Sequence, residues 1–107
     1  MILKGDRKMK KESLEEDVLN RYSILALGSM IKNEATNQIN SKTRLEIYHS
    51  TFKEVQTPPI QEQSLYAKLL KMKELGLLEN GYKVSRSKTY YVTKKGIELY
   101  EKIKNNK

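Results

Sequence analysis

The 107-residue chain contains no cysteine and no tryptophan, and only one histidine and one phenylalanine. Without cysteine there is no disulfide, no thiolate zinc site and no cysteine nucleophile. His49 has no ligand partners at metal-binding spacing, so we expect it at the surface and expect no metal or cofactor. The chain also lacks a run of roughly 18 apolar residues and the apolar segment of a secretory signal. We therefore expect a soluble, cytoplasmic, single-domain protein.

Positive charge is in excess, with a formal net charge of +8. Such a chain attracts polyanions. Lysine and arginine concentrate towards the two ends, and we expect residues 1–12 to form a flexible basic arm. The residues concerned are Lys4, Arg7, Lys8, Lys10 and Lys11 in the arm, and Lys83, Arg86, Lys88, Lys94, Lys95, Lys102, Lys104 and Lys107 in the last quarter.

Capping boxes predict the starts of two helices. "SLEE" from Ser13 opens a helix expected over residues 14–32, and "TRLE" from Thr43 opens one expected over residues 44–55. Gly28 would permit close packing of the first helix. The apolar faces expected from three- and four-residue spacing contain Leu14, Val18, Tyr22, Leu25 and Ala26 in the first helix and Leu45, Tyr48, Phe52 and Val55 in the second.

A third helix is expected over residues 61–75, after the break that "TPP" imposes. Its buried stripe would contain Leu65, Leu69, Met72 and Leu75, and Gly76 would be its C-cap. A β-hairpin is then expected over residues 77–93, because "LLENGYKVS" and "TYYVT" flank the basic "RSK".

The two adjacent tyrosines of this hairpin, Tyr90 and Tyr91, alternate across a strand, so we expect one in the core and the other at the surface or in a dimer contact. Thr93 would cap a last helix over residues 94–104, followed by the tail 105–107. The apolar face of that helix is marked by Ile97, Tyr100 and Ile103.

This order of elements predicts a winged helix-turn-helix, a mainly α fold with a small β-hairpin (α+β), in a single domain over residues 13–104. In that fold the helix after the turn enters the major groove of DNA and the hairpin, the wing, contacts the backbone.

The same segments resemble known families. "SLYAKLLKMKELGLLE" followed by "TYYVTKKG" is similar to the helix-and-wing region of PadR-type regulators, and more loosely to that of MarR-type regulators. The front half departs from PadR, because "TRLEIYHSTFKEVQTPP" replaces its Gly-Tyr-Glu stretch. That segment resembles the winged-helix domain of archaeal origin-recognition initiators, whose Walker loop is absent here. The resemblance implies a DNA-binding regulator or an origin-binding accessory protein.

Seven residues are candidates for contact with double-stranded DNA. On the third helix, glutamine suits adenine edges, lysine suits guanine or phosphate, and serine suits either, although an ordinary solvated helix face has the same composition. On the wing, three cations within six residues have no acid between them, although a solvated charged turn is the alternative. The candidates are Gln61, Ser64, Lys68, Lys71, Lys83, Arg86 and Lys88.

The sequence thus predicts a non-enzymatic, sequence-specific double-stranded DNA-binding protein, a small transcriptional regulator. A homodimer through the first and last helices would match paired half-sites. The alternative is a protein-interaction module, since fold alone does not specify function and Glu62 and Glu74 offset the lysines of the third helix. An enzyme is disfavoured because no nucleophile and base, phosphate-cradling loop or metal cluster is recognisable.

Overall fold

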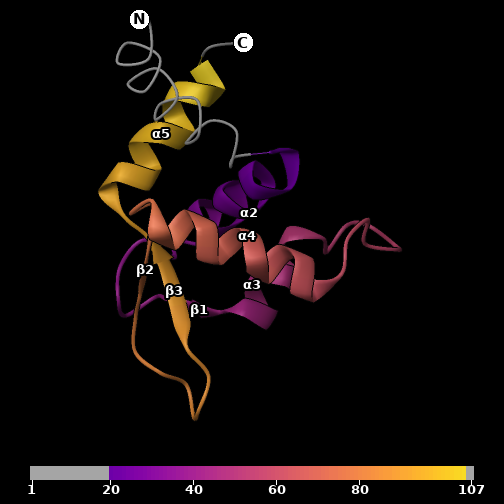
Figure 1. Ribbon diagram of the computed structural model, residues 1–107, viewed down its shortest axis with the longest axis horizontal. Helices are drawn as coiled ribbons and strands as arrows, with labels where there is room; N and C mark the ends of the chain where they lie inside the picture. Colours follow the sequence, from indigo (N-terminus) through magenta and orange to yellow (C-terminus); the bar gives the residue numbers. More distant parts are fainter. Residues whose placement is uncertain (1–19, 106–107) are drawn as a thin grey trace, which may run out of the picture.

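The computed structural model describes residues 20–105, which form helices on one side of a small antiparallel sheet (Figure 1). The basic arm and the end of the tail lie outside these residues. The elements are α2 (Arg21–Lys32), β1 (Lys42–Thr43), α3 (Arg44–Thr51), α4 (Glu62–Glu74), β2 (Leu78–Asn80), β3 (Thr89–Val92) and α5 (Lys94–Asn105). None of the helices between residues 20 and 105 has the length and apolar character required to cross a membrane.

Helix α2 begins later than the sequence predicted. Asn20 is its N-cap, with an extended backbone and a side chain that accepts hydrogen bonds from the amides of Tyr22 and Ser23, each at 3.0 Å. An unbroken helix over residues 14–32 is therefore wrong, because the Asn20 side chain satisfies the first amides of a new helix. Leu25, expected in the core, is 50% exposed. The Ser13 capping box lies outside the described residues.

Helix α3 begins as predicted and ends early. Thr43 Oγ1 accepts from the Glu46 amide at 3.2 Å, and the Glu46 carboxylate accepts from the Thr43 amide at 2.8 Å, which confirms the capping box. The helix stops at Thr51, four residues short of the expected end, because Phe52 leaves helical geometry to place its ring in the core. Leu45 and Val55 are exposed, and Ile47 takes the buried position instead.

Helix α4 matches its prediction within one residue at each end. Leu65, Leu69 and Met72 are buried. After the C-cap, Gly76 adopts a left-handed φ of 80°, donating to the Lys73 carbonyl at 2.9 Å, while the next amide donates to the Met72 carbonyl at 2.9 Å. This pair of bonds is a Schellman ending, which favours glycine because a Cβ is strained at positive φ.

The sheet has three antiparallel strands in the order β1-β3-β2, so β3 is central. The predicted hairpin is present, with Leu78 paired to Val92 and Asn80 to Tyr90. We call residues 78–92 the wing; in Figure 1 it extends away from α5. The sequence did not predict β1, whose two residues are too few to show a strand pattern.

The two adjacent tyrosines separate as expected. Tyr90 is 1% exposed, whereas Tyr91 is half-buried. Burial of the Tyr90 hydroxyl, followed by its hydrogen bond with Tyr66 of α4 and the nearby charge of that group, raises the pKa of Tyr90 to about 12, against an opposing effect of Arg44. The Tyr66–Tyr90 contact joins α4 to the central strand.

The start of α5 packs closely on the end of α4 and on the sheet. Thr93 Oγ1 accepts from the Gly96 amide at 3.1 Å and donates to the Gly76 carbonyl at 2.6 Å, which confirms Thr93 as the cap. A Cβ at Gly96 would overlap the carbonyl oxygen of Leu77 and lie 2.7 Å from Cγ1 of Val92. Only glycine therefore fits at this crossing without displacing backbone.

A second close approach lies between α2 and α5. A Cβ at Gly28 would lie 2.7 Å from the hydroxyl oxygen of Tyr100, which confirms the close packing expected of Gly28. Here the neighbouring atom is the far end of a side chain, which can shift. Ile97, Tyr100 and Ile103 are partly buried against the core, as predicted for this face of α5.

We predict that Gly96→Ala lowers the free energy of unfolding by about 1–2 kcal/mol. Overpacking against the Leu77 carbonyl costs about 2–3 kcal/mol, because the overlapped atom belongs to the backbone, and about 1 kcal/mol of helix propensity partly offsets it. Gly28→Ala is the matched control and should stay within about 1 kcal/mol of the wild type, because Tyr100 can move. Urea unfolding measures both. A Gly96→Ala protein as stable as the wild type would contradict the packing described.

We also predict a loss of stability at high pH through Tyr90. Its pKa is raised from 10.0 to about 12, so the stabilising contribution is complete below pH 10 and disappears as the pH rises towards 12. Unfolding by denaturant between pH 9 and 12 should show a steeper fall for the wild type than for Tyr90→Phe. Parallel curves for the two proteins would contradict this assignment.

Candidate nucleic-acid interface

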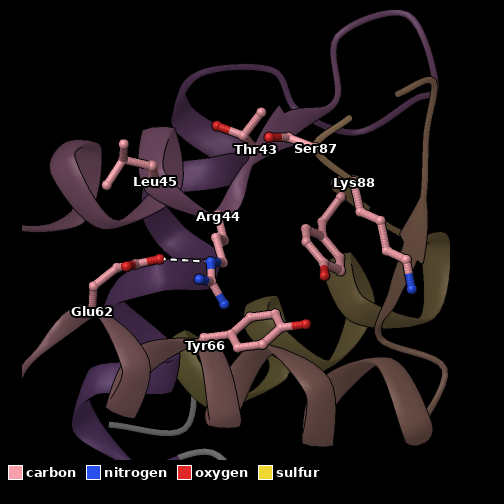
Figure 2. A pocket seen from close by; sticks show the side chains of 8 residues that line it. Thr43, Arg44, Leu45, Glu62, Tyr66, Ser87 and Lys88 are labelled. Atoms are coloured by element: carbon pink, nitrogen blue, oxygen red, sulfur yellow. Dashed lines mark ion pairs between the residues drawn. The ribbon is translucent and has the colours of Figure 1, made fainter. Parts of the chain in front are cut away.

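The candidate interface surrounds a pocket where the start of α3, the first half of α4 and the wing meet (Figure 2). The pocket has a volume of about 440 Å³. Polar and charged side chains from all three elements surround it. The lining residues are Thr43, Arg44, Leu45, Glu62, Tyr66, Ser87, Lys88 and Tyr90.

Arg44 is the cation on the α3 side of the pocket. It is the first residue of α3, directly after the Thr43 cap, and its side chain extends to α4. Its Nε atom lies 2.8 Å from Oε2 of Glu62, and the guanidinium carbon lies 4.1 Å from the centroid of the Tyr66 ring. An ion pair this exposed contributes little to stability, but with the ring it holds the guanidinium in one orientation.

Lys88 is the cation on the opposite, wing side. Its side chain is exposed, and Figure 2 shows it across the pocket from Arg44. The pocket therefore carries two cations and the one acid, Glu62, that pairs with Arg44. Charges arranged in this way favour an anion at the pocket mouth, since a single carboxylate does not neutralise both cations.

Lys83 and Arg86, the other two wing candidates, lie in the loop between β2 and β3 and are exposed. The loop is closed by paired backbone bonds between Val84 and Ser87, at 3.0 and 2.9 Å, with Ser85 at a φ of 58°. Within residues 20–105 neither cation has an acidic side chain at ion-pair distance. Both cations of the wing loop are therefore accessible to a polyanion.

The four candidates on α4 do not line this pocket. Gln61 is the N-cap and is exposed, Ser64 and Lys71 are exposed, and Lys68 is half-buried. Successive residues turn roughly 100° around a helix, so Ser64, Lys68 and Lys71 lie about 140–160° from Tyr66. Because Tyr66 faces the wing, those three residues occupy the flank of α4 turned away from it. The structure brings Lys88 together with Arg44 and separates it from the α4 lysines.

Sequence reasoning missed Arg44 and Tyr66. One local signal was available for Arg44: a cation at the first position of a helix is disfavoured by the helix dipole, so its presence there calls for another role. Tyr66 gave no such signal, because an aromatic residue at helical spacing is ordinarily expected in the hydrophobic core. His49 is exposed, as expected. No cluster of three or more potential metal ligands occurs among residues 20–105.

The chain is similar in structure to TubR from Bacillus megaterium pBM400, with a TM-score of 0.63 and 16% sequence identity over 84% of this chain and 93% of that chain. No family model and no curated protein matches the sequence. The resemblance to PadR, MarR and origin-recognition proteins thus stays a prediction. The structural likeness shows the fold: in the described residues, four helices and a three-stranded antiparallel sheet form the α+β arrangement of a winged helix.

Proposed function

We propose that this protein binds double-stranded DNA as a small transcriptional regulator, with α4 in the major groove and the wing on the sugar–phosphate backbone. The observation that carries the proposal is the pocket beside α4, where Arg44 and Lys88 approach from two separate elements. A duplex whose major groove receives α4 would present phosphates to these two cations.

Arg44 is suited to hold one of these phosphates. Its ion pair with Glu62 uses Nε, which leaves the two terminal nitrogens as donors, and its stacking on Tyr66 reduces the conformational entropy lost on binding. Lys88 supplies a second charge from the far side of the pocket. Lys83 and Arg86 extend the contact along the wing, where Arg86 has the length to enter a minor groove.

The far flank of α4 completes the arrangement. In this arrangement Lys68 and Lys71 would meet the phosphates across the major groove from the pocket, and Ser64 and Gln61, near the N-terminus of α4, would reach base edges or the backbone. The formal net charge of +8 adds attraction at longer range. In this function the protein needs no catalytic group.

A protein-interaction module is the second candidate; an origin-binding replication accessory protein, the other alternative, would use the same DNA-binding surface as the regulator. The observation that favours the interaction module is two apolar side chains on the wing, Tyr82 and Val84, which are 63% and 56% exposed. Such side chains suit a protein surface better than a phosphate backbone. The salt dependence of duplex binding separates the two candidates, since only DNA binding releases counterions in proportion to phosphate contacts.

We predict that Arg44→Gln, Lys88→Gln and Arg86→Gln each reduce the slope of log K against log salt by about one unit for a random duplex. Lys102→Gln is the charge-matched control, because Lys102 is an exposed residue of α5, at the end of the molecule opposite the wing tip. Its slope should stay close to that of the wild type. Fluorescence anisotropy at several salt concentrations gives the slopes. Equal slopes in all four variants would overturn the proposed interface.

We also propose that the protein is a homodimer through α2 and α5. The supporting observation is a shallow surface beside α2, where the half-exposed Leu25 lies with Tyr22, Ile24, Pro59 and the cation Arg21. Burying such a surface against a second copy would be favourable.

For the dimer we predict that sedimentation velocity at tens of micromolar gives twice the monomer mass, and that Leu25→Glu gives monomer. Val55→Glu, a similarly exposed position on the loop after α3, is the control and should remain dimeric. A wild-type protein that stays monomeric at these concentrations would contradict the proposal.

A further inference from the structure

We infer that α4 reads A·T base pairs, chiefly through thymine methyl groups, with a strip formed by Gln63, Ala67 and Leu70. The inference rests on the proposed function and adds to it the class of DNA sequence that the protein prefers. None of these three residues was among the candidates that the sequence suggested.

The strip occupies the outermost line of α4. All three side chains are exposed, and at roughly 100° per residue they lie within about 50° of the direction opposite to the buried stripe. Tyr66 and the pocket border the strip on one side, and Ser64 and Lys71 border it on the other. In a helix docked in the major groove, this line approaches the base edges most closely, while the two cationic flanks meet the phosphates.

The chemistry of the strip suits thymine and adenine. Alanine and other apolar side chains contact the thymine methyl group, and glutamine bonds both N6 and N7 of adenine. The strip has no lysine or arginine, which are the residues that pair with the O6 and N7 acceptors of guanine. A G·C pair set against Ala67 and Leu70 would lose water from its polar edge without gaining a hydrogen bond.

Leu70 is the residue that the fold itself does not explain. It is 39% exposed and lies outside the core cluster to which its neighbours Leu69 and Met72 belong. A leucine there leaves apolar surface in water, so burial against a thymine methyl group would recover part of that cost. Glu74 continues the same line but is the last residue of α4, farthest from the N-terminal turns that enter the groove.

The contacts of Tyr66 hold the strip at one angle to the wing. Its ring is covered by Arg44 and its hydroxyl interacts with that of Tyr90 in β3, and together with the buried stripe of α4 these contacts oppose rotation of the helix about its axis. A strip held at one angle positions its side chains for particular bases rather than for the groove in general.

The test starts by selecting duplexes from a random library with the wild-type protein. We expect the selected sites to contain a run of A·T pairs. Each thymine in the best site is then replaced by deoxyuridine, which removes the methyl group and keeps the base pairing. At the contacted thymines we expect affinity to fall about fourfold per methyl, as for the loss of one buried methylene-sized group.

Leu70→Ala should lose sensitivity to at least one of these replacements while keeping the salt slope of the wild type. Val55→Ala, an exposed apolar position away from α4, is the control and should retain full sensitivity. Selected sites rich in G·C, or an affinity that deoxyuridine leaves unchanged, would overturn this inference. If duplex binding still weakened steeply with salt, the proposed function would stand. A complete lack of salt-dependent duplex binding would overturn both.

Discussion

The position of Tyr66 determines the geometry of the candidate interface. The guanidinium of Arg44 lies over its ring, and its hydroxyl interacts with that of the buried Tyr90. Arg44 belongs to α3 and Tyr90 to the central strand, so the two contacts join α3, α4 and the sheet at one point. Because Tyr90 is packed in the core, it does not move independently of the sheet. The angle of α4 about its own axis, relative to the wing, follows from this arrangement.

With α4 held at that angle, three parallel bands run along α4 and its neighbours. Arg44 of α3 and Lys88 of the wing lie on the pocket side, Lys68 and Lys71 lie on the far flank, and the strip of Gln63, Ala67 and Leu70 between them is uncharged. Such a division separates two physical tasks. In the proposed DNA complex, cations on the flanks would supply attraction that depends on salt and hardly on sequence, whereas the strip would distinguish one base edge from another. Glu62 limits the charge of the pocket and keeps the guanidinium oriented.

Much of the fold was predictable because its signals are local. The capping box at Thr43, the glycine after α4 and the Thr93 cap each depend on atoms within a few residues, and all three are present. The predicted helix bounds were wrong where another local interaction overrode the apolar spacing. The apolar spacing that extended the second helix to Val55 placed Phe52 correctly in the core but did not show that Phe52 leaves helical geometry, beyond which Val55 is exposed. Asn20 began a new helix inside the predicted one by capping two amides.

The candidate site was likewise only partly predictable from the sequence. The order of the helices and the hairpin, the positive charge of the wing and the buried stripe of α4 were all predictable, because they depend on composition and on spacing along one segment. The flank of α4 that faces the wing and the presence of Arg44 in the candidate site became known only from the packing of the folded chain. Both follow from contacts between residues far apart in the chain, Arg44 with Glu62 and Tyr66 with Tyr90, and periodicity within a helix carries no information about its partners.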